Sequence, residues 1–247
     1  MVKSKVKYIQ SLSQKKQRDE DGVFIAEGPK IINELLADPA MEVIELFATA
    51  SWVASSRLLL LDIDSSKIIE IGEEELKRTS FLITPNQVLG LFKQPFTGVP
   101  TDFNGKITLM ADTLQDPGNM GTIIRCADWF GIDQLICSRE SADAYNPKTV
   151  QSSMGSIARV RVKYEDLGSV LTANPAVPAY AASLEGKSIY EMERISEGII
   201  LVGNESRGIS PDILRLIKNR ITIPRKGKAE SLNAAIAMGI ILSHLVK

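Results

Sequence analysis

Short apolar runs alternate with segments of helical periodicity along the whole chain, and this alternation restricts the fold more than any other feature of the sequence. Helix-like segments, the first over residues 118–130, separate the apolar runs of the second half. Strands separated by helices favour a parallel sheet, in which ligands bind at the carboxyl ends of the strands. The sequence therefore predicts an α/β fold, with strands at residues 107–111, 134–137, 179–182, 198–202 and 220–223.

The first half of the chain predicts a smaller α/β module, which begins with a helix carrying Val6, Ile9 and Leu12. The Pro/Gly-rich residues 93–100 lack periodicity and indicate a linker. We expect an N-terminal domain over residues 1–95, a linker over 96–105 and a C-terminal domain over 106–247. The expected strands of the first half are residues 23–26, 43–48 and 68–71, and the expected helices are 29–36, 52–61 and a segment from Glu73.

Charge is nearly balanced, with 29 Lys and Arg against 30 Asp and Glu, so the net charge does not indicate a nucleic-acid partner. Its distribution is uneven, because no acidic residue precedes Asp19. Basic clusters can neutralise phosphates, although a solvated surface explains either cluster alone equally well. The clusters are Lys3, Lys5, Lys7, Lys15, Lys16 and Arg18, and Arg215, Lys218, Arg220, Arg225, Lys226 and Lys228.

Several functional classes are disfavoured by what the sequence lacks. Cys126, Cys137 and His244 are the only residues of their types, too few for a conventional zinc site or a Cys–His catalytic pair, so we expect no metal. No GxGxxG follows a strand and no GxxxxGK[ST] occurs, which disfavours a Rossmann-type cofactor site and a P-loop. Because neither a signal peptide nor an apolar run of membrane length is seen, we expect a reduced cytoplasmic setting without a membrane.

Three loops, each following a strand of the second half, carry the polar residues that could do chemistry. The first contains Asn119, whose amide can cap the following helix or reach a ligand. Arg125 lies less than two helical turns further, on a neighbouring flank of that helix. On spacing alone, a surface salt bridge explains Arg125 better than a catalytic role does.

The second loop begins at Gly203, where a missing side chain lets a ligand approach the backbone, and continues through Asn204 and Glu205. The third loop is basic and leads into an Ala-rich helix that Ser231 is expected to N-cap. A tight turn and an ordinary capped helix explain much of these two loops, but they explain neither the basic residues nor Asn233.

Together the three loops resemble the signature motifs of the SpoU (TrmH-like) family, a branch of the SPOUT RNA methyltransferases. The motifs are N-x-G-x-x-x-R, G-N-E…R-G and I-P…G-x-x-x-S-L-N. They are matched by Asn119, Gly121 and Arg125, by Gly203, Asn204, Glu205 and Gly208, and by Ile223, Pro224, Gly227, Ser231, Leu232 and Asn233. The resemblance covers essentially the whole chain, because residues 15–30 look like the N-terminal substrate-binding domain of two-domain members. Gln151, Arg225 and Ala234-Ala235 depart from the family pattern at positions that bear on RNA contacts and substrate choice.

The resemblance implies a SPOUT domain with a parallel sheet and a deep trefoil knot, preceded by a small α/β RNA-binding domain. S-adenosyl-L-methionine would lie in the knot, held largely by the backbone at Gly203, Ile223, Leu232 and Leu184. The implied chain is a homodimer through the knotted domain, with each site completed by the partner. The implied catalytic residues are Arg125, which binds phosphate and stabilises oxyanion charge, and Asn119, Glu205, Ser231 and Asn233, which position the ribose and the cofactor.

The expected activity is therefore methyl transfer to a ribose 2′-hydroxyl of structured RNA, with ribosomal RNA favoured over transfer RNA. One alternative is a non-catalytic RNA-binding or ribosome-assembly factor on the same fold. It is disfavoured because Arg125, Asn119 and residues 231–233 are all present. A different α/β nucleotide-binding enzyme is a further alternative, and it lacks a matching fingerprint.

Overall fold

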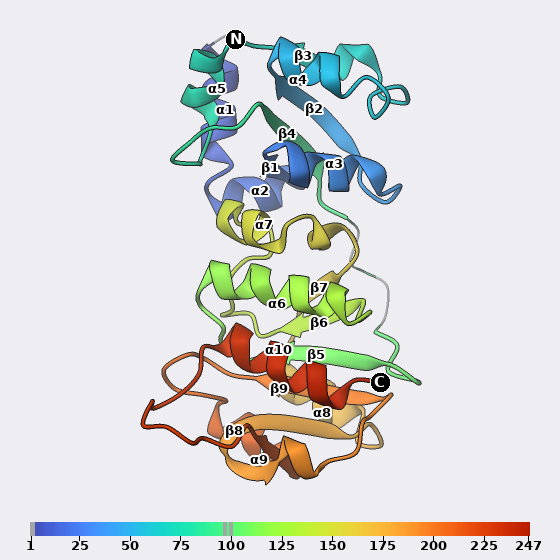
Figure 1. Ribbon diagram of the computed structural model, residues 1–247, viewed down its shortest axis with the longest axis vertical. Coiled ribbons are helices and arrows are strands. Elements are labelled where there is room, and N and C mark those ends of the chain that lie inside the picture. Colours follow the sequence, from blue (N-terminus) through green and yellow to red (C-terminus); the bar gives the residue numbers. More distant parts are fainter. Residues whose placement is uncertain (1–2, 96–97, 99–100) are drawn as a thin grey trace. The chain divides into compact units, whose positions relative to one another are not determined.

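The computed structural model describes residues 3–95, 98 and 101–247, which form two compact units (Figure 1). The first unit comprises Met1–Phe96 together with Asp143–Ala158, and the second comprises Thr97–Ala142 and Arg159–Lys247. The predicted C-terminal domain over 106–247 differs from the second unit, because residues 143–158 pack within the first. The predicted linker over 96–105 falls partly outside the described residues, which do not include 96, 97, 99 and 100.

A six-stranded sheet with all its neighbours parallel forms the centre of the second unit, which confirms the predicted α/β class. The strand order is β10-β8-β9-β5-β6-β7. The central strands β5 and β9 are buried throughout, as expected for a sheet covered on both faces. The strand bounds are β5 Ile107–Ala111, β6 Gln134–Cys137, β7 Arg161–Tyr164, β8 Ala179–Ser188, β9 Gly198–Val202 and β10 Asn219–Thr222.

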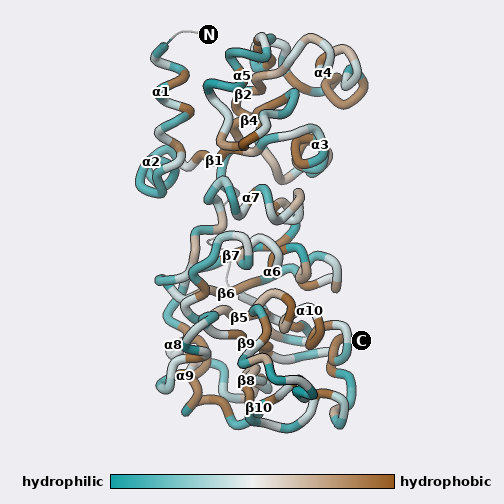
Figure 2. The backbone as a smooth tube through the Cα atoms, turned by 60° about the vertical axis from the view of Figure 1, so that its left-hand side comes forward, coloured by the Kyte–Doolittle hydropathy of each residue, from teal (hydrophilic) through white to brown (hydrophobic). Residues whose placement is uncertain are grey.

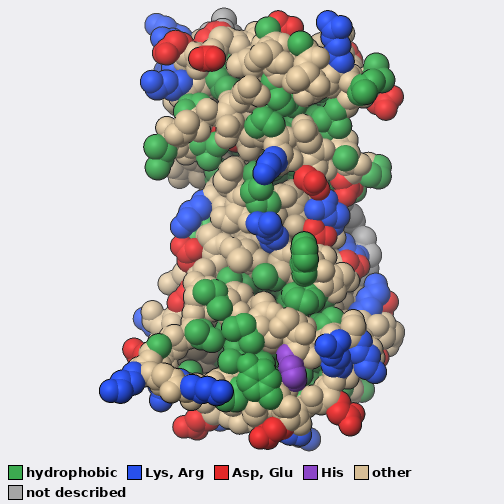
Figure 3. All heavy atoms as spheres, viewed as in Figure 1, with side chains coloured by type: hydrophobic (Ala, Val, Ile, Leu, Met, Phe, Trp, Pro, Cys, Tyr) green, Lys and Arg blue, Asp and Glu red, His purple; other side chains and the backbone are tan. Residues whose placement is uncertain are grey.

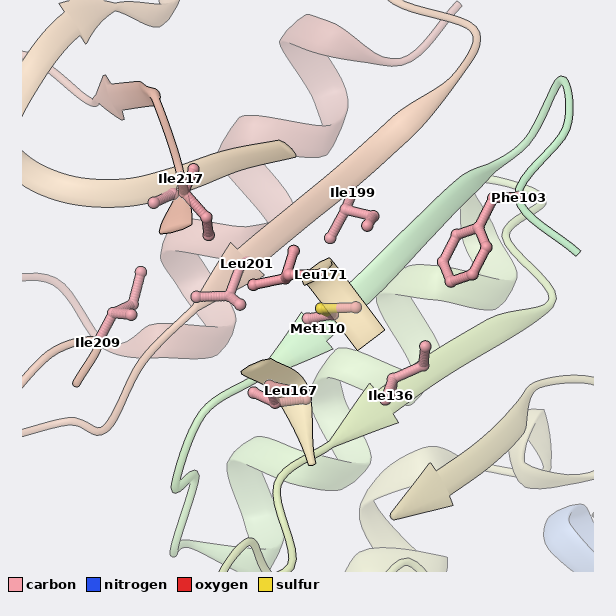
Figure 4. Packing of buried hydrophobic residues seen from close by; sticks show 10 residues of the cluster. Phe103, Met110, Ile136, Leu167, Leu171, Ile199, Leu201, Ile209 and Ile217 are labelled. Carbon is pink, nitrogen blue, oxygen red and sulfur yellow. The ribbon is translucent and has the colours of Figure 1, made fainter. Parts of the chain in front are cut away.

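Helices cover the two faces of this sheet. Figure 2 shows α8 (Leu167–Ala173) and α9 (Pro211–Leu216) on one side of the strands, and α6 (Pro117–Trp129) and α10 (Ala234–Leu245) on the other. The core under α8 and α9 combines side chains from the sheet with side chains from these helices and the loops beside them (Figure 4). Its buried members include Met110, Ile136, Leu167, Leu171, Ile199, Leu201, Ile209 and Ile217. Helices thus cover both faces of the sheet, and a ligand-binding site can form only at the carboxyl ends of its strands.

The first unit contains a four-stranded sheet of order β1-β4-β2-β3, in which β4 is antiparallel to both neighbours and β3 is parallel to β2. The predicted helix over 52–61 is wrong in length, because α4 ends at Ser55 and turns follow. Strand β4 and helix α2 were not predicted. The bounds are β1 Val23–Glu27, β2 Val43–Ala48, β3 Ile68–Glu70, β4 Val88–Lys93, α1 Lys3–Ser11, α2 Lys15–Asp21, α3 Pro29–Ala37, α4 Ala50–Ser55 and α5 Glu73–Thr79. Short 3₁₀ turns lie at Ser65–Lys67, Ser156–Ala158 and Ile189–Glu191.

Residues 143–158, which include α7 (Pro147–Ser153), complete the first unit. The ring of Tyr145 lies 5.0 Å from that of Phe24 on β1. Asp143 forms an ion pair with Arg18, whose side chain is only 1% exposed and also donates to the carbonyls of Leu12 and Ser13. The interpretation of Arg18 as a cation available to RNA phosphate is therefore wrong, because burial and an internal carboxylate already engage it.

In the described part of the chain, no helix has the length and apolar character that crossing a bilayer requires. Across the same residues, no cluster of three His, Cys, Asp or Glu side chains is placed to hold a metal ion.

Candidate active site

A cavity of about 860 Å³ opens at the carboxyl edge of the six-stranded sheet. Its walls come from β8, from the loop that follows β9 and from the long loop between β10 and α10. Six of the nine predicted site residues line it, namely Leu184, Gly203, Glu205, Ile223, Ser231 and Leu232. Leu184 lies within β8 rather than in a loop after residue 182, as predicted, because β8 extends to Ser188.

A hydrogen-bonded chain of three side chains joins the three motif loops at the rim of this cavity. The amide nitrogen of Asn119 donates to Oε1 of Glu205 over 2.9 Å. The amide oxygen of Asn119 accepts from Nδ2 of Asn233 over 2.8 Å. Because both ends of the Asn119 amide are engaged, its orientation is fixed, and three segments far apart in sequence meet at one point.

The helix caps explain how two members of this chain are placed. Asp116 is the N-cap of α6 and accepts from the backbone N–H of Asn119, so the Asn119 side chain is free to point at Glu205. Asn233 is the N-cap of α10, since its Oδ1 accepts from the N–H groups of Ala235 and Ile236. The prediction that Ser231 caps this helix is wrong. Ser231 lies two residues earlier, exposed on the cavity wall.

Gly203 is required for a structural reason that the sequence did not predict. A Cβ at this position would lie 2.2 Å from the carbonyl carbon of Gly208 and 2.2 Å from the nitrogen of Ile209. The loop returns on itself at this point, and Asn204 and Gly208 exchange two backbone hydrogen bonds of 2.9 Å. The small residue therefore lets the loop close on itself, and the closed loop forms one wall of the cavity.

Arg125 is exposed on α6 and does not line the cavity of its own chain. It makes no hydrogen bond and no ion pair with any residue that the structure describes, so the alternative of an intramolecular surface salt bridge is not supported. Its neighbour Cys126 is half-buried, and burial raises the pKa of that thiol, an effect that the Arg125 charge opposes. A protonated thiol is a poor nucleophile, which fits a site without cysteine chemistry.

The chain matches the model of the SpoU rRNA Methylase family over residues 106–243, more than half its length. The chain belongs to this family. Residues 3–90 match the MRM3-like substrate binding domain. A 23S rRNA guanosine 2′-O-methyltransferase of Bacillus subtilis is 30% identical over 98% of this chain and 95% of its own length.

Several solved SpoU-type structures superpose over nearly the full chain. A TrmH-family protein from Porphyromonas gingivalis is 35% identical with a TM-score of 0.86, and the match covers 100% of this chain and 98% of that one. An AdoMet-bound rRNA methyltransferase from Sinorhizobium meliloti is 28% identical with a TM-score of 0.84, over 98% and 94% of the two chains. The two-unit architecture is therefore found in other members.

The sequence motifs did not assign Asp112 or Arg207 to the candidate site, and Arg225 and Lys226 were named as basic residues rather than as cavity residues. Asp112, which follows β5 directly, is buried, and its Oδ2 accepts from the N–H of Ser210 over 2.7 Å. Arg207, Arg225 and Lys226 line the cavity, and the guanidinium of Arg225 donates to the carbonyl of Ala229 within the basic loop. A polar residue immediately after a central strand is a usable signal for Asp112, because such positions face the ligand edge of a parallel sheet.

Proposed function

We propose that the protein transfers a methyl group from S-adenosyl-L-methionine to a ribose 2′-hydroxyl of ribosomal RNA. The observation that carries this proposal is the Asn233–Asn119–Glu205 chain, which assembles the three family motifs at the rim of one cavity. Family membership supports the reaction class, and curated relatives from Bacillus subtilis and Streptomyces viridochromogenes carry the names of 23S rRNA 2′-O-methyltransferases. The AdoMet-bound relative from Sinorhizobium meliloti supports the cofactor.

The cavity suits this cofactor in size and in lining. Its volume lies within the range of small-molecule sites. Leu184 and Leu232 are 70% and 47% exposed on its walls, so an apolar ring system could cover them. Gly203 and Ile223 line the cavity, so their backbone groups can bind the cofactor. Such binding would not need the acidic ribose-binding residue of a Rossmann-type site. Bound there, S-adenosyl-L-methionine would supply an electrophilic methyl group.

The side chains of the chain then have to align the ribose oxygen, exclude water and help remove its proton. Glu205 accepts from Asn119 through Oε1, and no described residue donates to its Oε2, which can therefore accept from a ribose hydroxyl. Asn119 and Asn233 hold Glu205 in place, and Ser231 faces the same cavity. Arg125 stays protonated, so we assign it to phosphate binding and to oxyanion charge, with the proton passing to phosphate or water.

Arg125 is outside the cavity of its own chain, and this supports a homodimer in which α6 presents Arg125 to the partner's site. The exposed face of α6 also carries Trp129, which is 82% exposed. A large exposed aromatic side chain is typical of a protein interface. We therefore infer dimerisation through the second unit. The family's trefoil knot and the cytoplasmic location stay predictions.

RNA contacts are assigned to the exposed basic residues of the loop between β10 and α10 and to the first unit. Figure 3 shows Lys and Arg side chains projecting where this loop extends in Figure 1. Lys226 and Lys228 are exposed, and no described residue forms an ion pair with either of them. In the N-terminal basic cluster, Lys5 pairs with Glu45 and Lys16 with Glu20, which leaves fewer free cations there than the sequence suggests.

The deciding experiment maps ribose 2′-O-methyl groups in total RNA from cells with and without the protein, and repeats the reaction with purified protein and cofactor. We expect one site in ribosomal RNA to lose its methyl group in the deletion and to regain it in vitro. A site in transfer RNA would correct the substrate. RNA binding without any lost methyl group would favour the non-catalytic assembly factor instead.

Substituting Gly203 by alanine should weaken S-adenosyl-L-methionine binding by about tenfold or more, because the loop through Gly208 must move to admit the Cβ. Titration calorimetry measures the affinity. Gly168→Ala, on α8, is the matched control. Its Cβ would meet its neighbours only at ordinary contact distances of 3.5 Å and beyond. Equal affinities in the two variants would remove the Gly203 loop from the cofactor site.

A further inference from the structure

The turn that follows β5 is strained at Thr113. Its φ is +55°, a left-handed conformation that a β-branched residue rarely adopts. Among the residues described, Thr113 and Met154 are the only ones other than glycine with positive φ. Strained residues of this kind persist only where the surrounding structure holds them, and they concentrate at functional sites.

Every polar group of Thr113 is held. Its N–H donates to Oγ of Ser138 over 2.9 Å, and its hydroxyl donates to Oδ1 of Asp112 over 3.0 Å. Its carbonyl accepts from Nδ2 of Asn204 over 2.9 Å. Asn204 belongs to the loop that lines the cavity, so this last hydrogen bond joins the strained turn to the cofactor wall.

Asn204 has two separable roles. Its Oδ1 accepts from the N–H groups of Ser206 and Arg207, which folds the cavity loop, while its Nδ2 clamps Thr113. The turn at Thr113 leads within three residues to Asp116, which caps α6 and fixes Asn119. The position of Asn119 relative to Glu205 therefore depends on Asn204, which holds the turn at Thr113.

We propose that Asn204 is a positioning residue for methyl transfer, coupling the cofactor loop to Asn119 by clamping the strained turn at Thr113. This inference rests on the proposed function. Loss of the clamp lets Thr113 relax out of the left-handed region, and Asn119 then moves away from Glu205. A glycine at 113 adopts the left-handed conformation without strain and needs no clamp.

The test is a double-mutant cycle of Asn204→Asp and Thr113→Gly, measured by single-turnover methylation of ribosomal RNA and by calorimetry with S-adenosyl-L-methionine. Asn204→Asp keeps Oδ1 and replaces the donor that faces the Thr113 carbonyl with a charged oxygen that cannot donate. Its single-turnover rate should fall roughly 10- to 100-fold, because small misplacements near the chemistry cost that much, while cofactor affinity changes less than about threefold. Thr113→Gly alone should stay within about threefold of the wild type. The double variant should recover most of the rate that Asn204→Asp loses.

Asn219→Asp is the matched control, since it removes a comparable amide-to-carbonyl bond, to Ala179, outside the site. It should leave the rate unchanged. A double variant no faster than Asn204→Asp overturns the proposal, as does a normal rate in Asn204→Asp. If the wild type transfers no methyl group, the proposed function fails. The thermal unfolding of the same four proteins still tests the clamp, because Thr113→Gly must raise the melting temperature more in the wild type, where the clamp holds Thr113 in its strained conformation, than in the Asn204→Asp background, where Thr113 has already relaxed.

Discussion

Replacing Asp143 by alanine should destabilise the first unit by about 3–5 kcal/mol, because it leaves the buried Arg18 guanidinium without its counter-charge. The side chains of Arg18 and Asp143 are 1% and 10% exposed, so water cannot replace the lost carboxylate. Two backbone carbonyls still accept from Arg18, but they carry no net charge. Asp143→Asn keeps an acceptor without the charge, and its loss should be intermediate.

The chain offers a clean probe for this measurement. It contains two tryptophans, of which Trp52 is buried in the first unit and Trp129 is exposed in the second. In a Trp129→Phe background, the fluorescence of Trp52 alone follows urea unfolding of the first unit. Glu42→Ala, which breaks an exposed ion pair with Lys93 in the same unit, is the matched control and should cost less than about 1 kcal/mol. A loss in Asp143→Ala no greater than in the control would contradict the prediction.

The same ion pair shows where sequence reasoning ends. Arg18 and Asp143 are separated by 125 residues, and each alone looks like an ordinary surface charge. Periodicity cannot report a contact of that separation, so residues 143–158 were assigned with the strands on either side of them. Their packing against β1 also means that a truncation that removes residues 3–95 leaves Tyr145 without its contact to Phe24.

Local sequence patterns predicted correctly those elements in which all the neighbouring residues favour the same type of secondary structure. Residues 43–48 form a strand with the predicted bounds, because the segment is apolar and ends before a Thr N-cap. Strand β4 was missed because Gly90 interrupts its apolar run next to the predicted linker. The glycine is needed there because a Cβ would lie 2.5 Å from the Phe92 side chain. Strand β7 was missed because Arg161 and Lys163 alternate with its apolar residues at an edge of the sheet.

The motifs pointed to residues that the structure brings together around the cavity, but the arrangement of these residues could not be predicted from the motifs. The partners of Asn119 lie 86 and 114 residues away, and nothing local states that they share one amide. The left-handed turn at Thr113 could not be predicted for another reason. In a sequence, Gly, Asn or Asp indicates a position of positive φ, and threonine does not. Strain of this kind is found only in three dimensions.

Substituting Arg125 by alanine should lower the methyl-transfer rate by roughly a hundredfold or more, as the loss of one charge-stabilising donor does in other enzymes. Stability should change by less than about 1 kcal/mol, because Arg125 is exposed and forms no ion pair with any described residue of its chain. Cofactor affinity should barely change, since Arg125 does not line the cavity. Arg125→Lys should restore little, because a point charge cannot reproduce the planar, two-pronged contact with phosphate.

Single-turnover methylation at saturating cofactor separates this role from binding, with Arg194→Ala as an exposed control that should keep the wild-type rate. Mixing also tests the homodimer. If Arg125 acts in the partner's site, an inactive Arg125→Ala chain and an inactive Glu205→Ala chain should regain activity as a mixed dimer, because one of the two sites then holds both residues. If each chain instead uses its own Arg125, every site in the mixture lacks one residue and no activity returns. An Arg125→Ala variant that is folded, binds cofactor and keeps most of its rate would remove Arg125 from the mechanism in either arrangement.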